Sequence, residues 1–180
     1  NSSRSLFDLS DLKTSLIHIA ANTFTTTLVD KSTDPHVDSE GADPHDSKVV
    51  RMFSEIESDG YAVIRGPYLV SNNPLYLRSG EIVSFDYKVK AGRDAYDAFG
   101  YLVNSDTNEF ITILNETGAS DSAETDWETK SVNISQSGNY KFVFASGSFD
   151  FSGGTLLGAN LYLDNIAITP GPLLSVNNSV

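Results

Sequence analysis

The sequence contains no cysteine, a single tryptophan and a single methionine among its 180 residues. Without cysteine the chain forms no disulfide bond and holds no metal ion through thiolates. A cysteine-free domain that works outside the cell needs another means of stabilisation in place of disulfide bonds, and bound calcium stabilises many extracellular modules. The absence of cysteine therefore directs attention to oxygen ligands.

Basic residues are also scarce. Twelve Lys and Arg stand against 24 Asp and Glu, which gives a formal net charge of −12 and a pI near 4.4. Such a surface repels phosphate backbones and anionic lipids, so we expect no nucleic-acid partner. No run approaches the roughly twenty apolar residues of a membrane span, so we expect no membrane insertion. The first residues do not resemble a signal peptide. We expect the chain to be cut from a longer protein whose export signal lies elsewhere.

Motifs of catalysis are missing as well. No serine lies in a Gly-x-Ser-x-Gly context, and there is no phosphate-binding loop or dinucleotide fingerprint. His36 and His45 match no zinc-site spacing, and His18 is expected to pack against the fold. The lone Trp127 opens a strand pattern, which favours a core position over a sugar-stacking platform. We therefore expect no enzyme, although the paired carboxylates of an acidic glycosidase stay open as an alternative.

Short β-type patterns separated by turn residues fill the chain from residue 49 onward. Apolar and polar residues alternate most clearly in residues 82–90 and 138–146, and the connections are rich in Gly, Ser, Asn and Asp. This spacing predicts one all-β domain over residues 1–180, an antiparallel β-sandwich of jelly-roll type. Strands are expected at residues 23–29, 49–56, 61–65, 74–77, 82–90, 98–103, 109–115, 127–133, 138–146 and 159–168.

Two segments near the start depart from this pattern. Ser10 is a suitable N-cap for a short helix over residues 11–20. Residues 30–48 carry six acidic side chains and the triplet Asp-Pro-His twice. Proline and clustered Asp predict a long acidic loop there.

The segment 92–103, Gly-Arg-Asp-Ala-Tyr-Asp-Ala-Phe-Gly-Tyr-Leu-Val, joins a loop that begins with glycine to an alternating aromatic strand. Asp94 and Asp97 at a strand entrance are typical of turns, and they equally provide carboxylates for a calcium site. Gly92 allows the backbone to turn sharply. Arg93 has the chemistry to pair with a ligand carboxylate or with the neighbouring Asp.

Asp150 lies between two phenylalanines and precedes a glycine pair. It is either an exposed turn residue or a further ligand of the same calcium site, if the two loops share an end of the sandwich.

Asp164 interrupts a strongly apolar strand pattern. By alternation it shares a face with Tyr162 and Ile166, and a carboxylate on a buried face requires a partner. A structural calcium ion would satisfy this requirement. Asp59 and Glu57, in the turn before residue 61, are further candidate ligands.

Four stretches are similar to segments of a known family. They are Arg65-Gly66-Pro67, the 92–103 segment, Gly-Asn-Tyr-Lys-Phe-Val-Phe at 138–144 and Leu-Tyr-Leu-Asp-Asn-Ile at 161–166. With these, residues 49–168 resemble the calcium-dependent peptide-binding domains of bacterial RTX adhesins.

The resemblance implies a β-sandwich on the cell surface, part of a larger secreted protein, that serves cell adhesion. Its bound calcium would capture the C-terminal carboxylate of a surface protein on another cell. Asp94 and Asp97 would help to hold that ion. The candidates to read the last residues of the peptide are Arg65, Tyr68, Arg93 and Tyr96.

The sequence leaves other functions open. In a carbohydrate-binding module, calcium would grip the vicinal hydroxyls of a glycan. In a structural spacer of an adhesin, calcium would only rigidify the domain. An acidic glycosidase would turn over glycans through two carboxylates.

Overall fold

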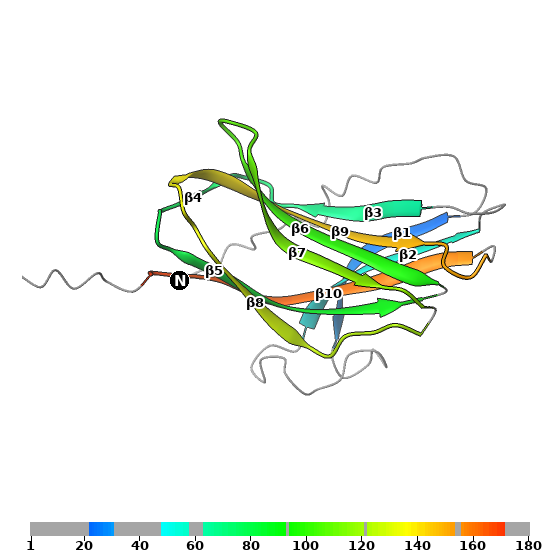
Figure 1. The fold of residues 1–180 in the computed structure, drawn as a ribbon. Helices are drawn as coiled ribbons and strands as arrows, with labels where there is room; N and C mark the ends of the chain where they lie inside the picture. The colour runs from blue at the N-terminus through cyan, green and yellow to red at the C-terminus, as the bar shows by residue number, and fades with distance from the viewer. Residues whose placement is uncertain are drawn as a thin grey trace, which may run out of the picture.

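The computed structural model describes residues 22–30, 48–57, 63–92, 94–120, 122–153 and 156–171. These residues form two antiparallel sheets packed face to face (Figure 1), so the predicted β-sandwich is confirmed. The predicted helix at 11–20 and residues 31–47 of the predicted acidic loop lie outside the described residues. Among the described residues, no helix has the length and apolarity needed to cross a bilayer.

Each sheet contains five strands. Sheet A has the order β1-β2-β10-β5-β8, formed by β1 (Asn22–Asp30), β2 (Lys48–Glu57), β10 (Leu156–Thr169), β5 (Ile82–Ala91) and β8 (Glu128–Asn133). Sheet B has the order β3-β9-β6-β7, formed by β3 (Val63–Val70), β9 (Gly138–Phe149), β6 (Ala95–Asn104) and β7 (Phe110–Gly118), and the short β4 (Leu75–Leu77) also pairs with β9. Every predicted strand from residue 23 onward therefore has a counterpart, with differences mainly at the ends.

The core lies between the sheets and follows the alternation that the sequence predicts. Phe85 of β5 and Phe144 of β9 are fully buried and meet edge-on, with ring centroids 5.2 Å apart. Complete burial of one such side chain contributes roughly 1.5–3 kcal/mol. Because side chains alternate along a strand, the residues between these core positions point outward and form the two outer faces of the sandwich.

One predicted strand end is wrong. The expected strand at 61–65 continues as β3 to Val70, through the Gly66–Pro67 pair. Arg65 and Tyr68 are three residues apart, yet their partners on β9, Gly147 and Ala145, are two apart. This extra residue is a β-bulge, which accommodates a proline because the bulged position is left out of the hydrogen-bond ladder. The bulge also places both Arg65 and Tyr68 on the outer face.

A second bulge interrupts β10 between Asp164 and Ala167, where Asn165 adopts a left-handed φ of 50°. The alternation shifts by one residue at this point. Ile166 consequently packs against the core, whereas Asp164 and Tyr162 lie on the outer face of sheet A. The expectation that Ile166 shares a face with Asp164 is therefore wrong.

Candidate functional site

The outer face of sheet B carries an aromatic surface that β6 builds by simple alternation. Ala98, Gly100 and Leu102 point into the core and are buried, so Phe99 and Tyr101 point outward and remain half-buried. A Cβ on Gly100 would lie 2.9 Å from both Leu114 and Phe144. Glycine at this position thus leaves room for the inward side chains of the neighbouring strands β7 and β9, while the large rings of β6 stay on the outside.

The rings of Phe99 and Tyr101 and that of Phe110 in the neighbouring strand β7 form a continuous row, which we call the aromatic row. The Phe99 and Tyr101 rings are 6.3 Å apart and nearly parallel, at 10°. Tyr101 then meets Phe110 of β7 edge-on, with centroids 5.5 Å apart at 85°. Phe110 is 66% exposed. A contiguous apolar patch on an open sheet face is typical of an interaction site, unlike a single exposed phenylalanine.

Charged and polar side chains flank the aromatic row. Arg65, Gly147 and Asp97 lie side by side on β3, β9 and β6, and no side chain stands between the two charged residues. A Cβ on Gly147 would lie 2.5 Å from the carbonyl oxygen of Asp97, so only glycine fits there. The Arg65 guanidinium also lies 5.3 Å from the centre of the Phe99 ring, a cation–π distance.

Asp97 accepts a hydrogen bond of 3.2 Å from the Thr117 hydroxyl. Burial raises the pKa of the Asp97 carboxyl above its ordinary value, while the Thr117 hydrogen bond and the charge of Arg65 act in the opposite direction. The face therefore presents a fixed acceptor and a fixed donor group beside the aromatic row.

The structure brings two of the predicted calcium ligands to the same end of the sandwich. Asp94 is fully buried, and its Oδ1 accepts the Ala95 N–H at 2.9 Å. Its Oδ2 accepts the Phe151 N–H at 3.0 Å and the backbone N–H and hydroxyl of Ser152 at 3.4 and 3.3 Å. Asp94 thus ties the start of β6 to the turn after β9, which contains Asp150.

Asp150 differs from Asp94 in how its oxygens are used. Its Oδ1 accepts the Gly153 N–H at 2.5 Å, but its buried Oδ2 has no hydrogen-bond partner among the described residues. Of these two carboxylates, only Asp150 has an oxygen without such a partner. The described residues contain no group of three or more His, Asp or Glu placed to hold a metal ion.

The other predicted site residues are dispersed. Asp164 lies on the outer face of sheet A opposite Asp86, far from the face that carries Asp97. Tyr96, a predicted peptide-reading residue, points inward and is 5% exposed, because adjacent residues of a strand point to opposite faces and Asp97 points outward. Arg65 and Tyr68 do share the outer face of sheet B. Asp59, Arg93 and the side chain of Glu57 lie outside the described residues.

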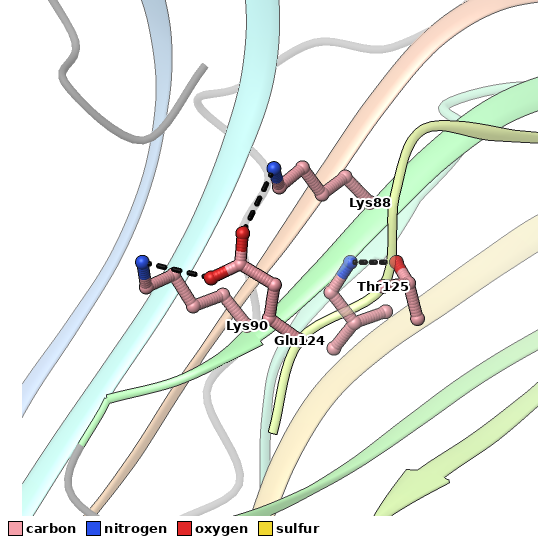
Figure 2. A network of polar contacts seen from close by, with 5 residues as sticks. Lys88, Lys90, Glu124 and Thr125 are labelled. Atoms are coloured by element: carbon pink, nitrogen blue, oxygen red, sulfur yellow. Dashed lines mark hydrogen bonds and ion pairs between the residues drawn. The ribbon is translucent and has the colours of Figure 1, made fainter. Parts of the chain in front are cut away.

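The outer face of sheet A is organised differently. The Glu124 carboxylate lies between the ammonium groups of Lys88 and Lys90, at 3.1 and 2.9 Å (Figure 2). Trp127 packs on Tyr162 with ring centroids 6.4 Å apart, in a small cluster on this outer face and not in the core between the sheets where the sequence places it. Lys88 is 3% exposed and Tyr162 fully buried. The described contacts on this face link residues of the fold to one another, so we take the outer face of sheet B as the candidate binding face.

Comparisons with known proteins give similar folds at low identity. No protein-family model matches the chain, and no curated protein matches its sequence. A promiscuous carbohydrate-binding module of the β-sandwich superfamily is 14% identical with a TM-score of 0.45, over 83% of this chain and 55% of that chain. This chain therefore spans about half the length of that module structure.

Two further solved structures match this chain at similarly low identity and TM-score. The K3 adhesin domain of Lys-gingipain from Porphyromonas gingivalis w83 is 20% identical with a TM-score of 0.43, over 80% of this chain and 91% of that chain. A variant of a family 29 carbohydrate-binding module is 16% identical with a TM-score of 0.35, over 67% and 71% of the two chains. At these values none of the three assigns a family or a ligand to this chain.

Proposed function

We propose that the chain is an extracellular binding module that holds a glycan on the outer face of sheet B. The observation that carries this proposal is the aromatic row, in which three contacting rings lie on an open sheet face. Rings stack on the apolar C–H faces of sugars, and a few fixed polar groups orient the hydroxyls. Arg65 and Asp97 are such groups, since each is already positioned by neighbours.

Preorganisation strengthens this reading. The rings of the aromatic row pack on one another, and Phe99 also lies under the Arg65 guanidinium. A ligand therefore orders few side chains when it binds, and the entropic cost of association falls. We propose binding without turnover, because among the described residues Asp97 faces Arg65 across Gly147 and not a second carboxylate.

A matched pair of variants tests this proposal. Phe110→Ala removes a ring of the aromatic row, and Phe151→Ala removes a phenylalanine of similar exposure, 58%, in the turn after β9. Losing a ring that anchors a ligand costs about 2 kcal/mol, or roughly thirtyfold in affinity. A glycan array identifies the glycan that binds best, and calorimetry measures its affinity. Phe110→Ala should lower this affinity and Phe151→Ala should not. Equal effects of the two variants would contradict the proposal.

A second candidate is calcium-dependent capture of the C-terminal carboxylate of a peptide, at a cell surface. The observations that favour it are the exposed Arg65 guanidinium on the binding face and the buried Asp150 oxygen that has no hydrogen-bond partner among the described residues. Peptides with free and amidated ends, each assayed with calcium and with chelator, separate this function from the first. Binding that requires both a free carboxylate and calcium selects peptide capture over glycan binding.

A further inference from the structure

A pocket of about 440 Å³ opens at one end of the sandwich, beside Phe110 and next to the inward-facing residues Asn104, Ile111 and Tyr140. It lies where the turn between β6 and β7 approaches the loop between β8 and β9, and that hairpin projects from the sandwich in Figure 1. Phe110 belongs both to the row and to the lining of the pocket. We infer that this pocket receives the end of the glycan, as a neutral terminal sugar. This inference rests on the proposed function and deepens it.

The backbone around the pocket is well fixed. Asn104, which is 4% exposed, accepts the N–H groups of Asp106 and Thr107 through its side-chain oxygen at 2.9 and 3.2 Å. The Asn108 N–H in turn donates to the Asn104 carbonyl at 2.9 Å. On the opposite side, the Tyr140 hydroxyl donates to the Gln136 carbonyl at 2.9 Å. The pocket is therefore part of the folded structure and does not require a ligand to form it.

The lining suits the hydroxyls of a sugar. The side chains of Asn108 and Gln136 are exposed and make no hydrogen bond to the described part of the chain. Each amide offers both a donor and an acceptor, as a sugar hydroxyl requires. The volume lies in the lower part of the range of about 300–1,000 Å³ that small-ligand pockets span. One end of an oligosaccharide fits such a space, and the adjoining sugars would pass Phe110 at the edge strand β7 to reach the aromatic row.

The charge of the lining selects a neutral sugar. The described residues that line this pocket include one acidic side chain, Glu109, and no Lys or Arg. A sugar carboxylate would meet this carboxylate in a chain whose net charge is already −12, and like charges at short distance repel. We therefore expect the pocket to reject uronic and other acidic terminal sugars.

Two matched variants test the pocket. Asn108 has a left-handed φ of 60°, which glycine also adopts, so Asn108→Gly removes the side chain without strain. Asn165, with a φ of 50°, is an exposed asparagine of the same conformation on the other sheet. Asn165→Gly is therefore the control. Gln136→Ala is an independent pocket variant, and Glu109→Gln removes the charge.

The probes are a ladder of neutral oligosaccharides, the same oligosaccharides blocked at either end, and a uronate-terminated series. Binding of the unblocked neutral ladder should fall about tenfold in Asn108→Gly and in Gln136→Ala, as expected for one or two lost hydrogen bonds, and stay unchanged in Asn165→Gly. Blocking one end should have the same effect in the unaltered protein. Glu109→Gln should improve binding of the uronate series.

The experiments give different results if this inference is wrong and if the proposed function itself is wrong. If Tyr101→Ala and Phe99→Ala leave glycan binding unchanged, the proposed function is wrong and the pocket has no role in it. A different outcome is that those variants abolish binding while the pocket variants bind like the unaltered protein and blocked oligosaccharides bind like unblocked ones. The aromatic row then contacts internal sugars of the glycan, and the pocket does not hold its end. In that case only the terminal-sugar inference is overturned.

Discussion

Replacing Asp94 should test whether this carboxylate acts through hydrogen bonds or through calcium. Asp94→Ala removes the acceptor for four donors, two of them at ordinary distances of 2.9 and 3.0 Å. A hydrogen bond to a charged acceptor contributes roughly 1.5–3 kcal/mol, so two such bonds amount to about 3–6 kcal/mol. Ser152, the donor of the two longer bonds, is exposed and can turn to water.

Water replacement at this turn favours the lower end of the range, so we expect Asp94→Ala to lower the free energy of unfolding by about 3 kcal/mol. For a chain of this size each kcal/mol shifts Tm by roughly 2–4 °C, which predicts a drop of about 6–12 °C. Urea unfolding and calorimetry measure the two quantities. Asp97→Ala, three residues along the same segment, should change stability by less than about 0.5 kcal/mol, as surface substitutions do.

Running both variants in calcium and in chelator makes the result decisive. If Asp94 acts through the hydrogen bonds described here, its replacement destabilises the domain equally in both conditions. If the destabilisation disappears in chelator, Asp94 acts as the calcium ligand that the sequence suggests. A change below about 0.5 kcal/mol in both conditions would refute the hydrogen-bond account itself.

Three further outcomes are expected. First, the unaltered domain should melt at a higher temperature in calcium than in chelator, because an ion that binds only the folded state adds stability; identical Tm values would contradict the predicted calcium site. Second, Asp97→Asn should weaken ligand binding yet be no less stable at neutral pH, since burial raises the pKa of Asp97. A carboxyl whose pKa is raised in the folded state stabilises the fold at low pH, and this stabilisation is lost as pH rises through that pKa. In urea titrations, the free energy of unfolding of the wild type should therefore increase relative to that of Asp97→Asn as the pH is lowered. Third, Glu124→Gln should cost roughly 1 kcal/mol at neutral pH. The hydrogen bond from Lys90 lowers the pKa of Glu124, so this difference should vanish as pH falls through the lowered value; a loss that persists in acid would argue against the ion pairs.

The strands could be predicted from the sequence because alternation and turn residues are local signals. The bulges could not, since a bulge is defined by the partner strand. Nothing in the order of residues 65–68 reveals that Gly147 and Ala145 lie opposite Arg65 and Tyr68. The same limit explains the error at Ile166, where an extra residue in β10 reverses the expected alternation.

The candidate site was predictable only in part. Arg65, Tyr68 and Asp97 do share one face, but for a reason that requires the register of three strands. Phe99 and Tyr101 carried a usable signal, since large rings alternate with Ala98 and Gly100. Phe110 carried none, because its contact with Tyr101 depends on how β7 pairs with β6.

The role of Asp94 shows the limit most clearly. Its carboxylate accepts hydrogen bonds from residues 151 and 152, more than fifty positions along the chain. A sequence presents Asp94 and Asp97 as two similar carboxylates in one loop. In the fold, Asp94 is buried and joins two turns through hydrogen bonds, whereas Asp97 is a partly exposed acceptor near Arg65.

The contrast between the two outer faces carries the functional argument further than any single residue. On sheet A the Glu124 carboxylate is shared by two lysines and Trp127 packs on a buried tyrosine, so that face serves the fold. On sheet B the Phe110 ring meets the Tyr101 ring edge to face and is 66% exposed, so most of its surface lies in water. Apolar surface in water contributes nothing to stability, and its burial by a ligand releases about 25 cal/mol for each Å² covered. On the described part of sheet B this stabilisation is still available, and a ligand that covers Phe110 would realise it.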